Sequence, residues 1–342
     1  MEEGNDGKHG SNVIISSRIR LARNFVNYPF PPKLNDRDAE EIISKVKNAF
    51  TNYQDGEIGD VLFIDLGNIG KIDKQMLVEK HLISPDLAAS TRRCAVVVSK
   101  TENLSVMINE EDHLRIQSLF NGMRIEDAWK LCNKADDILD RDMEYAFSET
   151  YGYLTCCPTN LGTGIRVSFM LHLPALVMTG YIRNILDACH KLNIMVRGIY
   201  GEHSEAIGNM FQMSNQITLG QTEEEIIESI KNIANQVVDQ ENILRTELYR
   251  QNSIKFEDRV YRSLGILTHA RSISADESLK LISDIRLGID MGIVKNIDIN
   301  TLNDLMLLIQ PGCLQKVMGE ALNPAELDVR RADLIRIKLG KE

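Results

Sequence analysis

Arg166-Val167-Ser168-Phe169-Met170-Leu171-His172-Leu173 is a run in which mostly polar side chains at even positions alternate with apolar ones at odd positions, and Pro174 follows it directly. A period of two indicates a strand with one buried face, and proline favours the first turn of a helix. A second alternating run occupies 210–219, after that helix. Alternating strands of this kind are typical of antiparallel sheets. The sequence therefore predicts an α+β fold with a largely antiparallel sheet flanked by helices.

Further elements are expected on both sides of this run. Upstream, helical spacing predicts helices over 36–50 and 125–147, and β-rich stretches predict strands at 12–16, 61–65, 95–99 and 104–109. Downstream, Thr222 and Glu225 form a capping-box pattern that begins a long amphipathic helix running toward Leu248.

The strand pattern disappears beyond about residue 250, where helix-start signals recur near 274, 300 and 323. A chain of 342 residues exceeds the usual size of one domain. We expect a polar tail over 1–12, a mixed α/β domain over 13–248 and an all-α C-terminal domain over 255–342.

The composition is that of an ordinary globular protein, with 26% charged and 43% hydrophobic residues. A net charge of −10 argues against nucleic acid as the main partner, because binding its phosphates needs a basic face, and favours cationic substrates. The most apolar run, 167–178, is too short to cross a membrane, and residues 1–12 lack a signal-peptide pattern. The six cysteines show no Cys-x-x-Cys spacing, so we expect reduced thiols and a cytoplasmic location.

Four short segments combine arginines with serines, glycines or glutamates: SSRIR at 16–20, NEEDHLRI at 109–116, CPTNLGTGIR at 157–166 and RGIYGEHSE at 197–205. A guanidinium group stays charged and matches phosphoryl oxygens in pairs. We therefore predict that a triphosphate is held by Arg18, Arg20, Arg115, Arg166 and Arg197. Taken singly, an arginine is more often a partner in a surface salt bridge.

The chain lacks the P-loop pattern and the His-Arg-Asp and Asp-Phe-Gly motifs of protein kinases. Side chains must therefore hold the phosphates. The run Gly162-Thr163-Gly164 could add backbone N–H donors as an anion nest, although a tight turn before a strand explains it equally well.

Two glutamates suit the acceptor side of such a site. If the acceptor is a guanidinium, it is protonated and weakly nucleophilic, so a carboxylate must orient it and remove a proton. Glu111 and Glu202 fit this role, although both also fit solvated loops. Cys157 is either a reactive thiolate beside arginines or a small buried hydrophobe. The histidines lack zinc-ligand spacing, so the only metal expected is Mg²⁺ held by nucleotide oxygens and water.

The four segments, in this order and spacing, resemble the motifs of the guanidino (phosphagen) kinases over about 13–245. The resemblance implies that the five arginines bind ATP phosphates, that Glu111 and Glu202 hold and deprotonate the guanidinium, and that Cys157 lines the acceptor pocket. It also implies a wider set of nucleotide-binding residues: Ser16, Ser17, Ile19, His81, Val167, Ser168, Phe169, Met170, Gly198, Ile199, Tyr200, Gly201 and Glu202.

Within that family the chain is most similar to the bacterial branch that phosphorylates arginine side chains of proteins. Metabolite-specific members place a helical domain of about a hundred residues before the first arginine pair, whereas this chain reaches Arg18 almost at once, and they lack the helical tail. The branch implies protein substrates marked for Clp-type degradation, a role in stress response and protein quality control, an activator subunit and a homodimer.

The resemblance has departures. His203 follows Glu202, as in kinases of free arginine. Asp328 and Arg331 lie in a segment similar to the phosphoarginine-binding motif Arg-Asp-x-x-Arg-Ala, but Leu327 replaces its first arginine. Two alternative functions therefore stay open: a kinase for free arginine or another small guanidino compound, and a non-catalytic nucleotide-binding adaptor.

Overall fold

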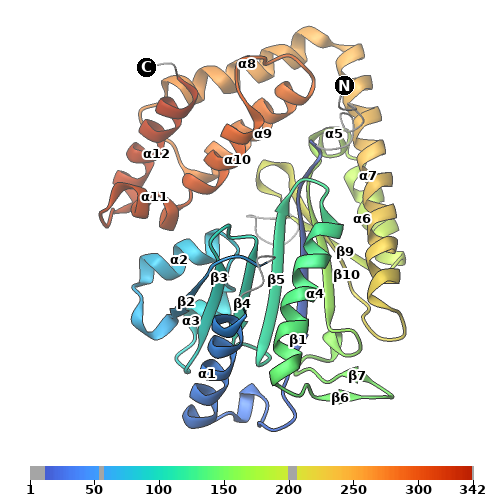
Figure 1. Ribbon diagram of the computed structural model, residues 1–342. Coiled ribbons are helices and arrows are strands. Elements are labelled where there is room, and N and C mark those ends of the chain that lie inside the picture. The colour runs from blue at the N-terminus through green and yellow to red at the C-terminus, as the bar shows by residue number, and fades with distance from the viewer. Residues whose placement is uncertain (1–11, 54–57, 199–205, 341–342) are drawn as a thin grey trace, which may run out of the picture.

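The computed structural model describes residues 12–53, 58–198 and 206–340. An eight-stranded sheet lies at its centre, with strand order β2-β3-β4-β5-β1-β8-β10-β9 (Figure 1). Every neighbouring pair of strands in this sheet is antiparallel, which confirms the predicted sheet type. Its strands are β1 (Ile14–Arg23), β2 (Val61–Asp65), β3 (Ala95–Ser99), β4 (Leu104–Ile108), β5 (Leu114–Asn121), β8 (Ile165–His172), β9 (Ile194–Gly198) and β10 (Met210–Asn215).

Helices flank the sheet and extend beyond it. Those that precede residue 252 are α1 (Asp36–Asn52), α2 (Lys71–Glu79), α3 (Pro85–Ala89), α4 (Ile125–Asp142), α5 (Pro174–Met178), α6 (Ile182–Lys191) and α7 (Glu223–Gln251). The C-terminal region contains α8 (Ser253–His269), α9 (Ala275–Asp290), α10 (Ile299–Leu308), α11 (Pro311–Met318) and α12 (Pro324–Leu339). A small hairpin of β6 (Phe147–Ser148) and β7 (Gly152–Tyr153) lies apart from the main sheet.

The two faces of the sheet are covered differently. On one face, Ile19 and Val167 pack in the main core with apolar residues of α1, α4 and α7. On the other face, Val96 and Met107 pack with residues of α2 and α3. The C-terminal helices reach this second face as well, because their core includes Ile15 of β1. A strip of polar side chains from β1, β5, β8, β9 and β10 occupies another part of the sheet.

Several elements lie where local sequence patterns predicted them. The capping box of Thr222 and Glu225 is formed, and α1 covers the predicted 36–50. The helix predicted over 125–147 ends earlier, at Asp142, because Met143 is extended and the amide of Ala146 donates to the carbonyl of Asn24 beyond β1. β5 and β9 were not predicted. No helix among the described residues is long and apolar enough to cross a bilayer.

A buried ion pair joins β1, α4 and the segment before β8. Arg23 and Asp136 lie 2.7 Å apart with side chains 2% and 9% exposed, and Arg23 Nη1 also donates to the carbonyl of Thr163. Removing the carboxylate would leave a buried guanidinium without its counter-charge. We expect Asp136→Ala to lower the free energy of unfolding by about 3–5 kcal/mol in urea titrations. The exposed neighbour Asp137 provides the control, since Asp137→Ala should change it by less than about 0.5 kcal/mol; equal effects would contradict this assignment.

Candidate active site

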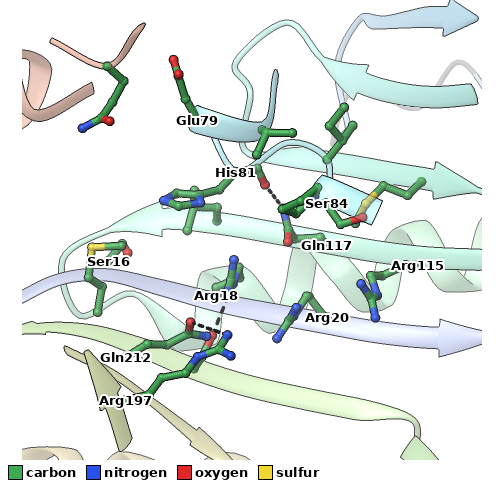
Figure 2. A pocket seen from close by; sticks show the side chains of 18 of the residues that line it. Ser16, Arg18, Arg20, Glu79, His81, Ser84, Arg115, Gln117, Arg197 and Gln212 are labelled. Atoms are coloured by element: carbon green, nitrogen blue, oxygen red, sulfur yellow. Dashed lines mark hydrogen bonds between the residues drawn. The ribbon is translucent and has the colours of Figure 1, made fainter. Parts of the chain in front are cut away.

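A cavity of about 620 Å³ lies over the polar strip of the sheet. Because strand side chains alternate, Ser16, Arg18 and Arg20 of β1 point into it together. Arg115 comes from β5 and Arg197 from β9, while His81 and Ser84 close the opposite wall after α2 (Figure 2). The structure therefore brings four of the five predicted arginines to one cavity.

The fifth arginine lies beside this group. Arg166 on β8 is directly opposite Arg20 in the register of β1 and β8, so both side chains leave the same face of the sheet. Burial lowers the pKa of Arg166, and the nearby positive charges of Arg115 and Arg197 lower it further. Like charges directly opposite on adjacent strands destabilise a sheet. Such an arrangement is expected where an anion balances the charge.

The arginines of β1 are the most strongly affected. Burial, followed by the charges of Arg197, Arg115 and Arg166, lowers the pKa of Arg18 to about 10. Burial, followed by the charge of Arg18 and of the same three neighbours, holds the pKa of Arg20 well below its usual value. Neither makes an ion pair with a carboxylate of the described residues, and Arg20 Nε is buried without a hydrogen-bond partner there. A polyanion would supply the missing acceptors, so these residues fit a triphosphate.

Polar partners hold two of these guanidinium groups in place. Arg18 Nε donates to Ser168 Oγ at 3.3 Å, and Arg197 Nη2 donates to Gln212 Oε1 at 3.3 Å (Figure 2). Both partners are neutral, so they orient the arginines without cancelling their charge. The positive charge of the cluster therefore stays available to a ligand.

Glu111 lies at the edge of the arginine cluster. Arg115 contacts Glu110 at 2.9 Å through Nη1 and Glu111 at 3.1 Å through Nη2. Arg115 also borders a second cavity, of about 670 Å³, whose wall includes Asp86, Glu110, Glu111 and Cys156. Burial raises the pKa of Glu111, and the acidic neighbours add to this while Arg115 opposes it. Glu111 lines this cleft, and because its side chain is 42% exposed its carboxylate can reach a ligand there.

Cys157 lies close to the same group. It is half-buried, its Sγ is 3.0 Å from Thr159 Oγ1, and it lies near enough to Arg166 to affect the pKa of that arginine. The thiol that lines the second cavity is that of its neighbour Cys156. Burial and nearby acidic groups raise the pKa of Cys156 to about 12, so that thiol is protonated at neutral pH.

His81 faces the arginines across the first cavity (Figure 2). Burial together with the charges of Arg18 and Arg20 lowers its pKa to about 4. The imidazole is therefore neutral at physiological pH and adds no further positive charge. Its backbone carbonyl accepts from Gln117 Nε2 at 2.5 Å, which fixes the segment after α2 above β5.

The structure does not bring every predicted nucleotide-binding side chain into the cavity. Ile19, Val167 and Phe169 are fully buried in the main core on the opposite face. Ser17 is buried too, and its hydroxyl donates to the carbonyl of Gly122. The side chains of these four residues do not line the cavity, because alternate residues of a strand face opposite sides. Ser16, Ser168, Met170 and Gly198 do line the cavity.

Three other expectations meet different outcomes. Glu202, like Ile199, Tyr200, Gly201 and His203, lies outside the described residues, so its role stays a prediction. The amide of Thr163 donates to the carbonyl of Thr218, so the central amide of the Gly162–Gly164 segment is not available to an anion nest. No cluster of three metal-binding side chains occurs among the described residues.

The residues predicted to bind phosphoarginine, Asp328 and Arg331, contact each other and other parts of the C-terminal region. Arg331 is 2% exposed, and its Nε and Nη1 donate to the carbonyls of Ile309 and Ile273, both at 2.8 Å. Nη1 also contacts Asp328 Oδ1 at 2.5 Å. These donors are used to join α12 to the end of α10 and to the segment before α9. Nε and Nη1 of Arg331 are therefore already engaged by contacts within the C-terminal region, and phosphoarginine binding there stays a prediction.

Sequence reasoning missed several residues that line the cavities. Gln117 follows Arg115 by two positions, so a correct prediction of β5 would have placed it on the same face. Gln212 pairs with Arg197 across β10 and β9. Glu79 and Gln310, at the far end of the cavity, carry no signal in the sequence.

Comparisons with known proteins assign this arrangement to a family. Residues 41–244 match the family described as ATP:guanido phosphotransferase, C-terminal catalytic domain. Residues 253–342 match the protein-arginine kinase McsB C-terminal domain. Over 341 residues the chain is 48% identical to a protein-arginine kinase of Geobacillus sp. (strain WCH70), covering 100% of this chain and 93% of that protein. The chain belongs to the protein-arginine kinases of the ATP:guanido phosphotransferase family.

Further relatives and solved structures support the same family. It is 48% identical over 332 residues to the protein-arginine kinase of Bacillus subtilis (strain 168), covering 97% of this chain and 91% of that protein. The duplicated taurocyamine kinase of Schistosoma mansoni superposes with a TM-score of 0.61 at 27% identity, over 70% of this chain and 34% of that one. Lombricine kinase gives a TM-score of 0.61 at 22% identity, over 68% and 67%, and shares the fold. The chain is thus a guanidino phosphotransferase enzyme with the phosphagen-kinase fold.

Proposed function

We propose that this enzyme transfers the γ-phosphoryl group of ATP to arginine side chains of proteins. The observation that carries the proposal is the position of Arg115, which borders the arginine-lined cavity and also contacts Glu111 in the neighbouring cleft. A triphosphate bound by the arginines would have its terminal phosphate beside Arg115. A guanidinium held by Glu111 would then lie in line with it. The names of the relatives at 48% identity support a protein as acceptor.

The chemistry needs few covalent contributions from the protein. A nitrogen of the substrate guanidinium attacks the γ-phosphorus, an N–P bond forms, the bond to the β–γ bridging oxygen breaks, and ADP leaves with that electron pair. Glu111 accepts the proton that the nitrogen loses, together with Glu202 if the prediction for that residue holds. The transition state is loose, with charge on the equatorial oxygens, so the arginines contribute mainly by electrostatic stabilisation and alignment.

Mg²⁺ fits this scheme as part of the nucleotide complex. Bound to phosphate oxygens, Mg²⁺ would neutralise the part of the triphosphate's negative charge that the arginines do not neutralise. Since the described residues contain no cluster of metal-binding side chains, we assign it to nucleotide oxygens and water. The role of the protein is then to bind the remaining oxygens through Arg18, Arg20, Arg166 and Arg197.

The family suggests finer points that we include in the proposal. We propose a catalytic domain over 13–248 and a helical domain over 255–342 that supports a homodimer. We also propose a cytoplasmic enzyme that acts in stress response and protein quality control, with an activator subunit, and whose products are recognised by Clp-type proteases.

A comparison of acceptors tests the substrate class. The full chain is incubated with Mg-ATP and either casein or free arginine at equal arginine concentration, and ADP release is followed. Phosphoarginine on the protein is measured by mass spectrometry without acid treatment, because the P–N bond is acid-labile. We expect phosphoarginine on casein and faster ADP release with casein. Turnover with free arginine alone would favour a kinase of small guanidino compounds, and binding of ATP without turnover would favour the adaptor.

A further inference from the structure

The C-terminal region contributes Gln310 to the lining of the arginine-lined cavity. Gln310, which immediately precedes α11, lines the cavity together with Glu79 at the end of α2. Figure 2 shows Arg20 and Arg115 at one end, and His81, Ser16 and Glu79 toward the other. We name this second end, lined by Ser16, His81, Met170 and Gln310, the base end. Arg18 lies between the two ends, and its charge acts on His81.

The nucleotide orientation follows from the two ends. The γ-phosphate must lie near Arg115, because the acceptor cleft with Glu111 opens there. The triphosphate then occupies the arginine end, and the purine base extends away from it. The base end is the part of the cavity that remains for the base, and Met170 on β8, in register with Ser16, supplies an apolar surface there.

Gln310 is held at the base end by contacts between α11 and α2. The Glu79 carboxylate accepts from the amides of Gly312 at 2.8 Å and Cys313 at 2.7 Å, which satisfies free N–H groups at the start of α11. Lys316 and Asp73 add an ion pair at 2.6 Å. The two helices touch closely, since a Cβ at Gly312 would lie only 2.8 Å from the Met76 amide nitrogen.

The amide of Gln310 has a defined orientation. Its Nε2 donates to the carbonyl of Met306 at 3.1 Å, and a carbonyl can only accept, so Oε1 must point the other way. Oε1 accepts no hydrogen bond from the described residues, and the residue is 8% exposed. An acceptor at this position matches the amino group of adenine and opposes the carbonyl that guanine carries there.

We propose that Gln310 recognises the adenine base and that Glu79 is the positioning residue that keeps Gln310 in the cavity. The inference rests on the proposed ATP site. It makes the C-terminal helical region part of the nucleotide-binding site, with α11 contributing base selectivity to a pocket whose phosphate end belongs to the sheet. Displacing α11 from α2 would weaken ATP binding without altering the arginines or Glu111.

Equilibrium binding of Mg-ATP and Mg-GTP to the full chain tests this. By calorimetry, Gln310→Ala should weaken ATP binding about tenfold, the loss of one hydrogen bond to the base. GTP binding should stay within about twofold, so the ATP/GTP ratio falls. Glu79→Gln should shift the ratio in the same direction and raise the KM for ATP while kcat stays near wild type. A merely structural role would weaken both nucleotides together.

A matched glycine pair separates the helix contact from general damage. Gly312→Ala should push α11 away from α2 and lower the ATP/GTP ratio, whereas Gly265→Ala, where the added Cβ meets nothing within 4 Å, should leave it unchanged. If Gly312→Ala does not fold, Gln310→Ala decides. An unchanged ratio in folded Gln310→Ala would overturn the inference. Arg18→Ala tests the nucleotide site itself. If Arg18→Ala keeps full ATP affinity, the proposed function fails too. If Arg18→Ala loses ATP affinity while Gln310→Ala leaves the ATP/GTP ratio unchanged, only the role of Gln310 is rejected.

Discussion

Replacing Arg197 by alanine is expected to lower kcat by about 10³-fold, the scale of one arginine that stabilises a transferring phosphoryl group. Arg197 extends from the edge strand β9 into the cavity, where its charge acts on Arg18 and Arg166 and only neutral Gln212 contacts it among the described residues. Its charge is therefore available to the transition state. The measurement is steady-state ADP release with saturating Mg-ATP and an arginine-rich protein.

The control for this variant is an arginine outside the cavity. Arg250 is exposed on α7 and among the described residues forms an ion pair only with nearby Glu247, so Arg250→Ala should keep kcat within about twofold. Circular dichroism and the urea midpoint of Arg197→Ala should stay close to wild type, because the one contact that is lost among the described residues is a 3.3 Å hydrogen bond to neutral Gln212. A kcat of Arg197→Ala equal to that of Arg250→Ala would remove Arg197 from the phosphate site.

Replacing Glu111 by glutamine is expected to lower kcat by about 10²–10⁴-fold, the usual contribution of a general base. The substitution keeps shape and volume but removes the negative charge that orients a guanidinium and accepts its proton. Arg115 keeps Glu110 as a partner at 2.9 Å, so the arginine should stay in place and ATP affinity should change little. Single-turnover kinetics with a protein acceptor, beside ATP titration, separates the chemical step from nucleotide binding.

An exposed carboxylate gives the comparison for Glu111. Glu247→Gln alters a surface pair on α7 and should leave both kcat and ATP affinity unchanged. If Glu111→Gln turned over within about threefold of Glu247→Gln, Glu111 would not be the base. A loss of ATP affinity as large as the loss of kcat would instead place Glu111 in nucleotide binding.

The sequence predicted elements whose signals are local. Helix α1 follows from the spacing of Ile42, Val46 and Phe50, and the start of α7 follows from its capping box. β5 was not predicted because its polar face, with Arg115 and Gln117, lines the cavity and so lacks the usual apolar signal of a buried strand. Its start also adjoins a turn dominated by charged residues. The start of α8 escaped too, since it follows α7 after the single residue Asn252.

The residues of the site likewise fall into those that a local pattern predicts and those that depend on long-range packing. The motif arginines of β1 could be placed on one face because alternation in a strand is a local property. The same rule, applied strictly, would have removed Ser17 and Ile19 from the expected contacts. Glu79 and Gly312 are 233 residues apart in the chain, and their contact depends on how the C-terminal helices pack against α2. No periodicity or motif encodes such a contact, so the contribution of Gln310 to the base end could not be foreseen, although Ser16, His81 and Met170 were expected to bind nucleotide.

The most direct test of the central claim is a crystal structure of the full chain with Mg-ADP, nitrate and an arginine-containing peptide. Planar nitrate stands in for the transferring phosphoryl group. We expect the diphosphate and nitrate among Arg18, Arg20, Arg115, Arg166 and Arg197, with the peptide guanidinium against Glu111 on the far side of the nitrate. Nucleotide bound away from these arginines, or a guanidinium remote from Glu111, would contradict the account.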